Sequence, residues 1–231
     1  MSDFKYVENN LFEVMETCER VCRRVGASMP KLVAVTKSAS DDEVLALARL
    51  GIGAIGENRP GELVRRGDLL AASGFSPELH QIGTLQSNKA KLVLQRASLI
   101  HSLASESLIR ELVRLARRDA CRARVLVEVN SACEPNKDGV LPNDCERFVE
   151  RVLEYPELEL MGLMTMGPAH CTAEDIRPYF RKTRELFEKI GARYGYAGEG
   201  ILSMGMTDSF AVAIEEGTTL IRVGRRLFVN D

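Results

Sequence analysis

The sequence lacks any apolar run near the ~18 residues that a helix needs to cross a membrane. Its first residues, Met1 to Lys5 (MSDFK), also lack the apolar core of a secretory signal peptide. The sequence therefore gives no indication of membrane insertion or of secretion. We expect a cytoplasmic protein with no membrane partner.

Cysteine pairs at metal-binding spacing are absent as well. None of the six cysteines forms a C-x-x-C pair, and Cys18 and Cys22 have no histidine or second cysteine pair nearby to complete a metal site. A disulfide framework is typical of small secreted domains, which this chain does not resemble. We expect reduced cysteines that mostly pack in the core, and no bound metal.

An excess of basic charge is the third feature that the chain lacks. It has 31 Lys and Arg against 33 Asp and Glu, whereas general nucleic-acid binding requires a basic surface that displaces counterions. The locally basic stretch 114–124 is typical of the solvent-facing side of a helix. No G-x-x-x-x-G-K-[ST] motif occurs, and the glycines of residues 51–56 stand between a predicted helix and a strand, not in the strand-to-helix turn of a dinucleotide site. Nucleic acids and dinucleotides are therefore not expected ligands.

What the chain does contain is a regular alternation of strands and helices. With 231 residues, of which 45% are hydrophobic, it can bury a substantial core. An amphipathic helix is predicted over residues 3–25. Eight strand-then-helix units follow, the number that builds a (β/α)8 TIM barrel. The predicted strands are 32–37, 54–58, 79–83, 99–103, 124–130, 158–165, 201–206 and 219–224.

The units follow one another without a linker or a low-complexity segment. We therefore predict an α/β fold with a single barrel domain, residues 1–231, and an extra N-terminal helix. A doubly wound open sheet is the alternative. Such a sheet rarely needs eight units and usually has a glycine-rich first turn.

Lys37 is the residue around which the predicted site is organised. It follows the apolar run 32–36, and Ser40 with Glu43 forms a capping box that starts the next helix. In barrels the carboxyl ends of the strands carry the functional residues. A partly desolvated lysine there can attack a carbonyl and form a Schiff base. The alternative for this segment alone is a lysine that ends a strand and points into water.

An anion site is predicted beyond the last two strands. Ser203 and Thr207 supply hydroxyls, Gly205 permits close backbone approach, and the helix that follows presents N–H groups to a phosphate. Gly224, just past the eighth strand, allows a second close approach of the backbone. A simple helix N-cap by Thr207 or Asp208 is the alternative.

Several other polar or soft side chains lie in or next to apolar strands. Arg222 lies within the eighth strand, either in the barrel lumen or outside under a helix, and its permanent charge requires a partner. His80 is either a site residue or a hydrogen-bonded packing residue, and His101 and His170 rank below it as functional candidates. The methionines expected to pack the barrel are Met161, Met164, Met166, Met204 and Met206.

Seven stretches, taken in order along the chain, carry a family resemblance. They are LVAVTK with Lys37, IGEN with Asn58, HQIGTLQSNK from His80, IHSL from Ile100, VEVN…NKDG from Val127, GLMTM from Gly162, and LSMGMTDSFAVAIEEGTTLIRVG from Leu202. With these stretches the chain resembles the pyridoxal-phosphate homeostasis protein family, which shares its barrel with the N-terminal domain of alanine racemase. The last stretch is long and specific.

The resemblance implies that the chain binds pyridoxal 5′-phosphate (PLP) as a Schiff base of Lys37, with Arg222 facing the pyridine nitrogen. An arginine there keeps the ring nitrogen unprotonated, which weakens the cofactor as an electron sink. The residues implied to surround the phosphate are Ser203, Gly205, Thr207 and Gly224. Those implied to line the ring are Asn58, His80 and Met164.

The chain departs from the family's pattern at three places. They are Arg59-Pro60-Gly61 after the second strand, Cys133 where glycine is usual, and Val229-Asn230-Asp231 in place of a usual glycine. None of these departures touches the implied cofactor contacts.

The resemblance implies a monomer that holds and supplies the cofactor inside the cell, passing it to PLP-dependent apoenzymes without evident catalysis and so influencing amino-acid and keto-acid balance. The alternative is a PLP-dependent amino-acid racemase. Racemisation needs two acid/base groups on opposite faces of the intermediate, and in alanine racemase the second is a tyrosine from a second domain of the partner subunit. The five tyrosines of this chain fall on predicted helices or outer loops, and we expect no second domain after the eighth strand. Both features favour the carrier.

Overall fold

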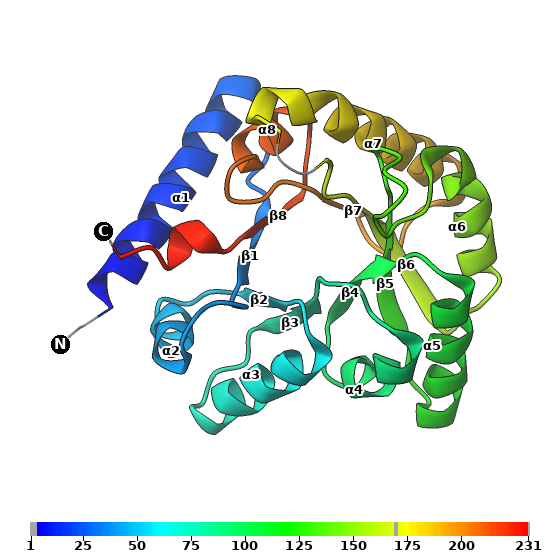
Figure 1. Ribbon diagram of the computed structural model, residues 1–231, viewed down its shortest axis with the longest axis horizontal. Coiled ribbons are helices and arrows are strands. Elements are labelled where there is room, and N and C mark those ends of the chain that lie inside the picture. The colour runs from blue at the N-terminus through cyan, green and yellow to red at the C-terminus, as the bar shows by residue number, and fades with distance from the viewer. Residues whose placement is uncertain (1–3, 169–170, 231) are drawn as a thin grey trace.

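The computed structural model describes residues 4–168 and 171–230, and within them eight parallel strands close into a barrel in chain order (Figure 1). The strands are β1 (Lys31–Val35), β2 (Ala54–Glu57), β3 (Glu78–Gln81), β4 (Leu99–Leu103), β5 (Ala123–Glu128), β6 (Leu158–Met164), β7 (Ile201–Ser203) and β8 (Leu220–Val223). They are buried because helices cover the outside and side chains fill the lumen. The predicted (β/α)8 barrel is confirmed.

Within the described residues, a helix follows each of β1 to β7 and lies on the outside of the barrel (Figure 1). These helices are α2 (Asp41–Arg49), α3 (Pro60–Ala72), α4 (Ala90–Leu94), α5 (Glu106–Asp119), α6 (Cys145–Leu153), α7 (Ala173–Tyr194) and α8 (Phe210–Glu215). Three short 3₁₀ turns accompany them: η1 (Ser87–Lys89), η2 (Pro142–Asp144) and η3 (Arg225–Leu227). Strand ends therefore meet at one mouth, where the loops into these helices begin.

The N-terminal helix α1 (Lys5–Val25) takes the place that a helix after β8 would occupy. β8 is followed by η3 instead, and α1 runs beside α8 and the C-terminal segment in Figure 1. The apolar side chains that join α1 to the outer faces of β1 and β8 are Val7, Val14, Cys18, Val21, Cys22, Leu32, Ala34, Ile221 and Val223. Asn10 Nδ2 also donates to the carbonyl of Val229 at 2.8 Å. The helix thus holds together β1, which precedes Lys37, and β8, which contains Arg222.

All strands except β4 end one to three residues earlier than the sequence predicts, and local backbone geometry explains the ends of β1 and β7. β1 ends at Val35 because the chain turns there, with the Ala39 N–H donating to the Thr36 carbonyl at 3.0 Å. β7 ends at Ser203 because Gly205 adopts a left-handed φ of 92°. Lys37 and Thr207 consequently lie in loops at the mouth of the barrel and not in strands.

The departure at Cys133 has a measurable energetic consequence. Cys133 is exposed and has a left-handed φ of 55°, which costs an L-residue about 1–2 kcal/mol, whereas glycine adopts it freely. Glycine is more flexible in the unfolded chain, which offsets about 0.5–1 kcal/mol of this gain. We expect Cys133→Gly to raise the free energy of unfolding by about 0.5–1 kcal/mol in a urea titration. Ala132→Gly, at a neighbouring position without a positive φ, should lower it, and equal effects of the two changes would contradict the explanation.

Candidate functional site

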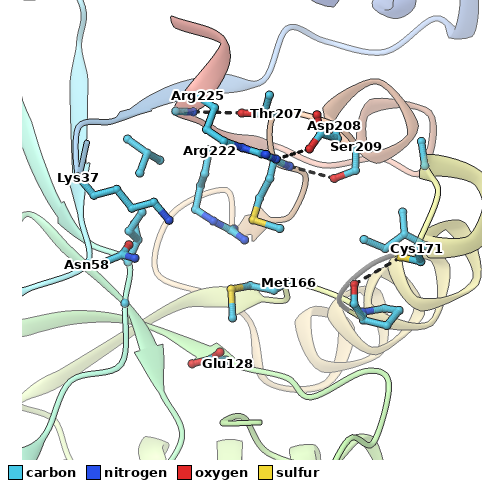
Figure 2. Close-up of a pocket in the computed structure, with 18 of the residues that line it drawn as sticks. Lys37, Asn58, Glu128, Met166, Cys171, Thr207, Asp208, Ser209, Arg222 and Arg225 are labelled. Atoms are coloured by element: carbon cyan, nitrogen blue, oxygen red, sulfur yellow. Dashed lines mark hydrogen bonds and ion pairs between the residues drawn. The ribbon is translucent and has the colours of Figure 1, made fainter. Parts of the chain in front are cut away.

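A cavity of about 680 Å³ lies at the carboxyl ends of the strands (Figure 2). Small-molecule sites typically enclose about 300–1,000 Å³. The predicted site residues that lie in its wall are Lys37, Asn58, Thr207, Arg222 and Gly224. The structure thus brings residues from the first, second, seventh and eighth strand–loop units to one space.

Lys37 is held at the cavity by the turn that follows β1. Its side chain extends from this turn toward the guanidinium of Arg222 (Figure 2). Next to it, Thr36 Oγ1 donates to Glu57 Oε1 at 2.5 Å and so ties the end of β1 to the end of β2. The predicted capping box of Ser40 then starts α2. The backbone that carries the Lys37 amine is therefore fixed from both sides.

A buried ion pair between Glu57 and Arg66 supports the turn that carries Lys37. Burial raises the pKa of Glu57, while the hydrogen bond from Thr36 and the nearby charge of Arg66 act in the opposite direction. Arg66 Nε lies 3.7 Å from Glu57 Oε1, and the Arg66 guanidinium also donates to the Ala39 carbonyl and to Asp41. α3 is therefore anchored to both sides of the Lys37 turn.

The loops after β2 and β3 approach each other so closely that only glycine fits. A Cβ atom on Gly83 would lie 2.6 Å from the carbonyl oxygen of Asn58. Gln81 Nε2 bridges the same two loops, donating to the Asn58 carbonyl at 2.9 Å and to the Gly83 carbonyl at 3.0 Å. This packing holds Asn58, half-buried, in the cavity wall.

The loops after β7 and β8 form the part of the wall best suited to an anion. The Gly224 N–H donates to Thr207 Oγ1 at 3.4 Å, which joins the two loops. A Cβ on Gly224 would lie 3.1 Å from the Val35 carbonyl oxygen and would crowd the end of β1. Because glycine has no Cβ, the backbone of Gly224 is exposed at this point. Lys37, Arg222 and Arg225 add positive charge to the wall, although Arg225 pairs with Asp208. The residue that precedes α8 is Ser209, so the alternative of a Thr207 or Asp208 N-cap is wrong.

Arg222 lies in the barrel lumen, which settles the alternatives left open by the sequence. It is 4% exposed, and its guanidinium donates to the Thr165 carbonyl at 3.0 Å and to Ser203 Oγ at 2.5 Å. Burial lowers the pKa of Arg222 to about 10, so it stays charged at neutral pH. Its hydrogen-bond partners in the described residues are neutral.

Glu128 is a wall residue that sequence reasoning missed. It lies at the end of β5, is 4% exposed, and faces the cavity (Figure 2). The pKa of Glu128 is raised to about 7, mainly by burial and also by the charge of Asp138, while the charge of Arg222 acts in the opposite direction. The strand was expected to run to Asn130, and a carboxylate directly after the apolar run 125–127 was the signal that could have identified it.

Four of the predicted contact residues do not line the cavity: His80, Met164, Ser203 and Gly205. His80, Met164 and Ser203 are at most 1% exposed. Ser203 is bonded to Arg222, while Gly205 accepts the backbone N–H of Arg222 at 3.0 Å. Ser203 and Gly205 therefore contact Arg222 directly. His170 lies outside the described residues.

The prediction that all five methionines pack the barrel is wrong for two of them. Met161, Met164 and Met204 are buried, but Met166 and Met206 are 41% and 39% exposed and lie in the cavity wall. The reason is that β6 and β7 end at Met164 and Ser203, so Met166 and Met206 belong to the mouth loops.

The expectations about metals and membranes can be compared only with the described part of the chain. All six cysteines lie in it and are free. Within residues 4–168 and 171–230, no group of three or more His, Cys, Asp or Glu side chains could hold a metal ion. No helix in these ranges is both long and apolar enough to span a bilayer.

Comparison with known proteins identifies the class to which this barrel belongs. Residues 10–230 match the family described as alanine racemase, N-terminal domain. The chain is 37% identical over 220 residues to a pyridoxal phosphate homeostasis protein of Aquifex aeolicus, covering 94% of this chain and 95% of that one. It is 30% identical over 233 residues to the protein of the same name in Caenorhabditis elegans, covering 96% and 95%. The chain therefore belongs to the pyridoxal phosphate homeostasis protein family.

Solved structures agree with this assignment. An unknown protein from Bifidobacterium adolescentis superposes with a TM-score of 0.90 at 30% identity, covering 99% of this chain and 97% of the other. PipY of Synechococcus elongatus with PLP bound gives a TM-score of 0.79 at 27% identity, covering 92% and 100%. Alanine racemase from Corynebacterium glutamicum, at 17% identity and a TM-score of 0.69, covers 99% of this chain and 62% of its own length. That likeness shows the fold alone.

Proposed function

We propose that residues 1–231 act as one domain that binds pyridoxal 5′-phosphate as a Schiff base of Lys37 and takes part in the homeostasis of this cofactor. The observation that carries the proposal is that a lysine amine and a buried arginine lie in the wall of one cavity at the barrel mouth (Figure 2). The related PipY structure with PLP bound supports the choice of ligand.

The residues of the wall fit the separate parts of this cofactor. Thr207 and the backbone at Gly224 would hold the phosphate, with positive charge from Arg225 nearby. Lys37 would attach through its Nζ to the aldehyde carbon with loss of water. Asn58 would lie against the ring. When bound, the cofactor supplies a reactive aldehyde and an electron-accepting ring.

Arg222 would face the ring nitrogen, and its charge limits what the site can do. Because the guanidinium remains protonated at neutral pH, it disfavours a proton on a nearby ring nitrogen. An unprotonated ring nitrogen makes the cofactor a weaker electron sink. A cationic residue at this position suits storage of the cofactor better than carbanion chemistry.

We propose a carrier and not a racemase for a second reason. Among the described residues, no tyrosine lies in the cavity wall, and Tyr6, Tyr179 and Tyr194 belong to α1 and α7 outside the barrel. A two-base racemase requires a second acid/base group opposite the lysine. Purified protein incubated with a panel of L-amino acids should give no racemase or transaminase turnover. Rapid turnover on any of them would overturn the carrier proposal.

The cellular context follows from the same proposal. A carrier that releases its cofactor by exchange of one imine for another can supply PLP-dependent apoenzymes. We propose that it does so as a monomer in the cytoplasm.

We expect Lys37→Ala to abolish the visible absorption band of the protein reconstituted with PLP. The band requires an imine, and the described wall contains no other lysine. A matched control is Lys91→Ala, which changes an exposed lysine on α4 and should leave the band unchanged. A band of full intensity in Lys37→Ala would contradict the assignment of the attachment site.

A further inference from the structure

A chain of buried hydrogen bonds runs through the barrel lumen from its amino-end opening to the candidate site. At the amino end, Glu78 contacts Lys31 at 2.6 Å and His80 Nε2 at 3.1 Å. His80 Nδ1 lies 2.9 Å from His101 Nε2. His101 Nδ1 lies 3.1 Å from Ser203 Oγ, which also bonds Arg222. We call the five residues Glu78, His80, His101, Ser203 and Arg222 the lumen chain.

The carboxylate at one end of the lumen chain sets the direction of its hydrogen bonds when both imidazoles are neutral. An arginine can only donate, and an ionised carboxylate can only accept. The hydrogen bond to His80 lowers the pKa of Glu78 to about 2, so this carboxylate is ionised at neutral pH. With both rings neutral, the carboxylate requires a hydrogen on His80 Nε2, and each further link then carries a hydrogen that points away from Arg222 and toward Glu78.

One tautomer of each imidazole satisfies this order. Ser203 accepts from Arg222 and donates its hydroxyl hydrogen to His101 Nδ1. His101 then donates from Nε2 to His80 Nδ1, and His80 donates from Nε2 to Glu78. Both rings are neutral in this arrangement. Burial, which is nearly complete for both, lowers the pKa of His80 and of His101 in agreement with it.

The charged groups around the two rings act in mixed directions. For His80, the carboxylate of Glu78 raises the pKa, whereas Lys31 and Arg124 lower it. For His101, His80, Arg222 and Lys31 all lower it. A positive charge on His101 would lie one serine away from the guanidinium of Arg222, which explains why the inner ring is kept neutral.

We propose that His101, with its tautomer set by His80, is a positioning residue that holds Arg222 in the orientation required at the cofactor ring. The inference rests on the proposed function, in which Arg222 faces the ring nitrogen. The lone pairs of Ser203 are available to Arg222 because His101 takes the serine hydrogen. Without His101 Nδ1 as acceptor, the hydroxyl hydrogen of Ser203 has no partner within the lumen chain. It can then turn toward the guanidinium of Arg222 and repel it. Neither histidine touches the cavity wall.

Two amide substitutions at His101 separate the two links. The amide of asparagine can replace the Nδ1 position, so His101→Asn keeps the bond from Ser203 and loses the bond to His80. The amide of glutamine can replace Nε2, so His101→Gln keeps the bond to His80 and loses the acceptor for Ser203. Both remove one buried imidazole and one hydrogen bond, so a merely structural role would affect them equally.

We expect His101→Gln to bind PLP about tenfold more weakly than the unmodified protein and to shift the absorption maximum of the bound cofactor, since an unsatisfied buried group next to Arg222 disturbs it. His101→Asn should bind within about threefold and keep the original maximum. Equal affinities and spectra of the two variants would overturn the positioning role. Failure of the unmodified protein to bind PLP would instead overturn the proposed function, and this inference with it.

The tautomers are tested independently, on the protein without added PLP. The chain has three histidines, so a ¹⁵N-histidine NMR spectrum is simple to assign with the two His101 variants. At pH 7 we expect His80 and His101 to be neutral with the hydrogen on Nε2. A hydrogen on Nδ1 of either ring, or a charged ring, would overturn the assigned direction of the lumen chain.

Discussion

Glu128→Gln is expected to become more stabilising as the pH rises from 4.5 to 8. The folded state raises the pKa of Glu128 from 4.5 to about 7. Below pH 4.5 the carboxyl is protonated in both states and contributes no pH dependence. Between 4.5 and 7 the folded state binds more protons than the unfolded state, so the stability of the unmodified protein falls as the pH rises. Glutamine cannot ionise and lacks this loss.

The size of the effect follows from the shift. Each pKa unit corresponds to about 1.4 kcal/mol, so the stability difference between Glu128→Gln and the unmodified protein should grow by roughly 3 kcal/mol between pH 4.5 and 8. Denaturant unfolding at these two pH values measures it. In a background of Asp138→Asn the growth should be smaller, because the Asp138 charge is one of the causes that raise the Glu128 pKa. A difference that stays constant with pH would contradict the raised pKa of the buried Glu128 carboxyl.

Gly205→Ala is expected to destabilise the protein by about 3 kcal/mol or more. Gly205 has a φ of 92°, which costs an L-residue about 1–2 kcal/mol. A Cβ there would lie 2.5 Å from the Cβ of Ala213 and 3.0 Å from the Cα of Phe210, and overpacking of this kind costs about 1–3 kcal/mol. The carbonyl of Gly205 also accepts the Arg222 N–H, so the change reaches the site.

The control for Gly205→Ala is a glycine of ordinary geometry. Gly61 lies in the first turn of α3, has no positive φ, and has open space where a Cβ would be added. Alanine has the higher helix propensity, so Gly61→Ala should stabilise the protein by about 0.5–1 kcal/mol. If Gly205→Ala unfolded at the same denaturant concentration as the unmodified protein, the close packing described for the loop after β7 would be contradicted.

The barrel could be predicted from the sequence because its signal is local and repeated. The apolar run 32–35 of β1 is uninterrupted, and helices such as α5 have one strongly apolar face and a serine cap at Ser105. Lys37 was found because a lysine that follows an unbroken apolar strand marks the mouth of a barrel. The structure shows it there, although in the turn beyond the strand.

The parts that could not be predicted depend on the closing of the barrel. Which lumen residues reach the mouth is set by strand length and stagger, which a sequence does not show. His80 and Ser203 were predicted as ligand contacts; they do not line the cavity, and the lumen chain connects them to Arg222. The contact between His80 and His101 joins β3 to β4 inside the barrel and has no signal in either strand. The position of α1 over β1 and β8 likewise follows only from closure.

Reduction of the PLP-loaded protein with borohydride, followed by proteolysis and mass spectrometry, tests the central claim most directly. Borohydride converts an imine to a stable secondary amine, so the modified peptide reveals the residue that held the cofactor. A single modified peptide whose label lies on Lys37 is the predicted result. A label on another lysine, or protein that remains unmodified after reduction, would contradict the proposed site.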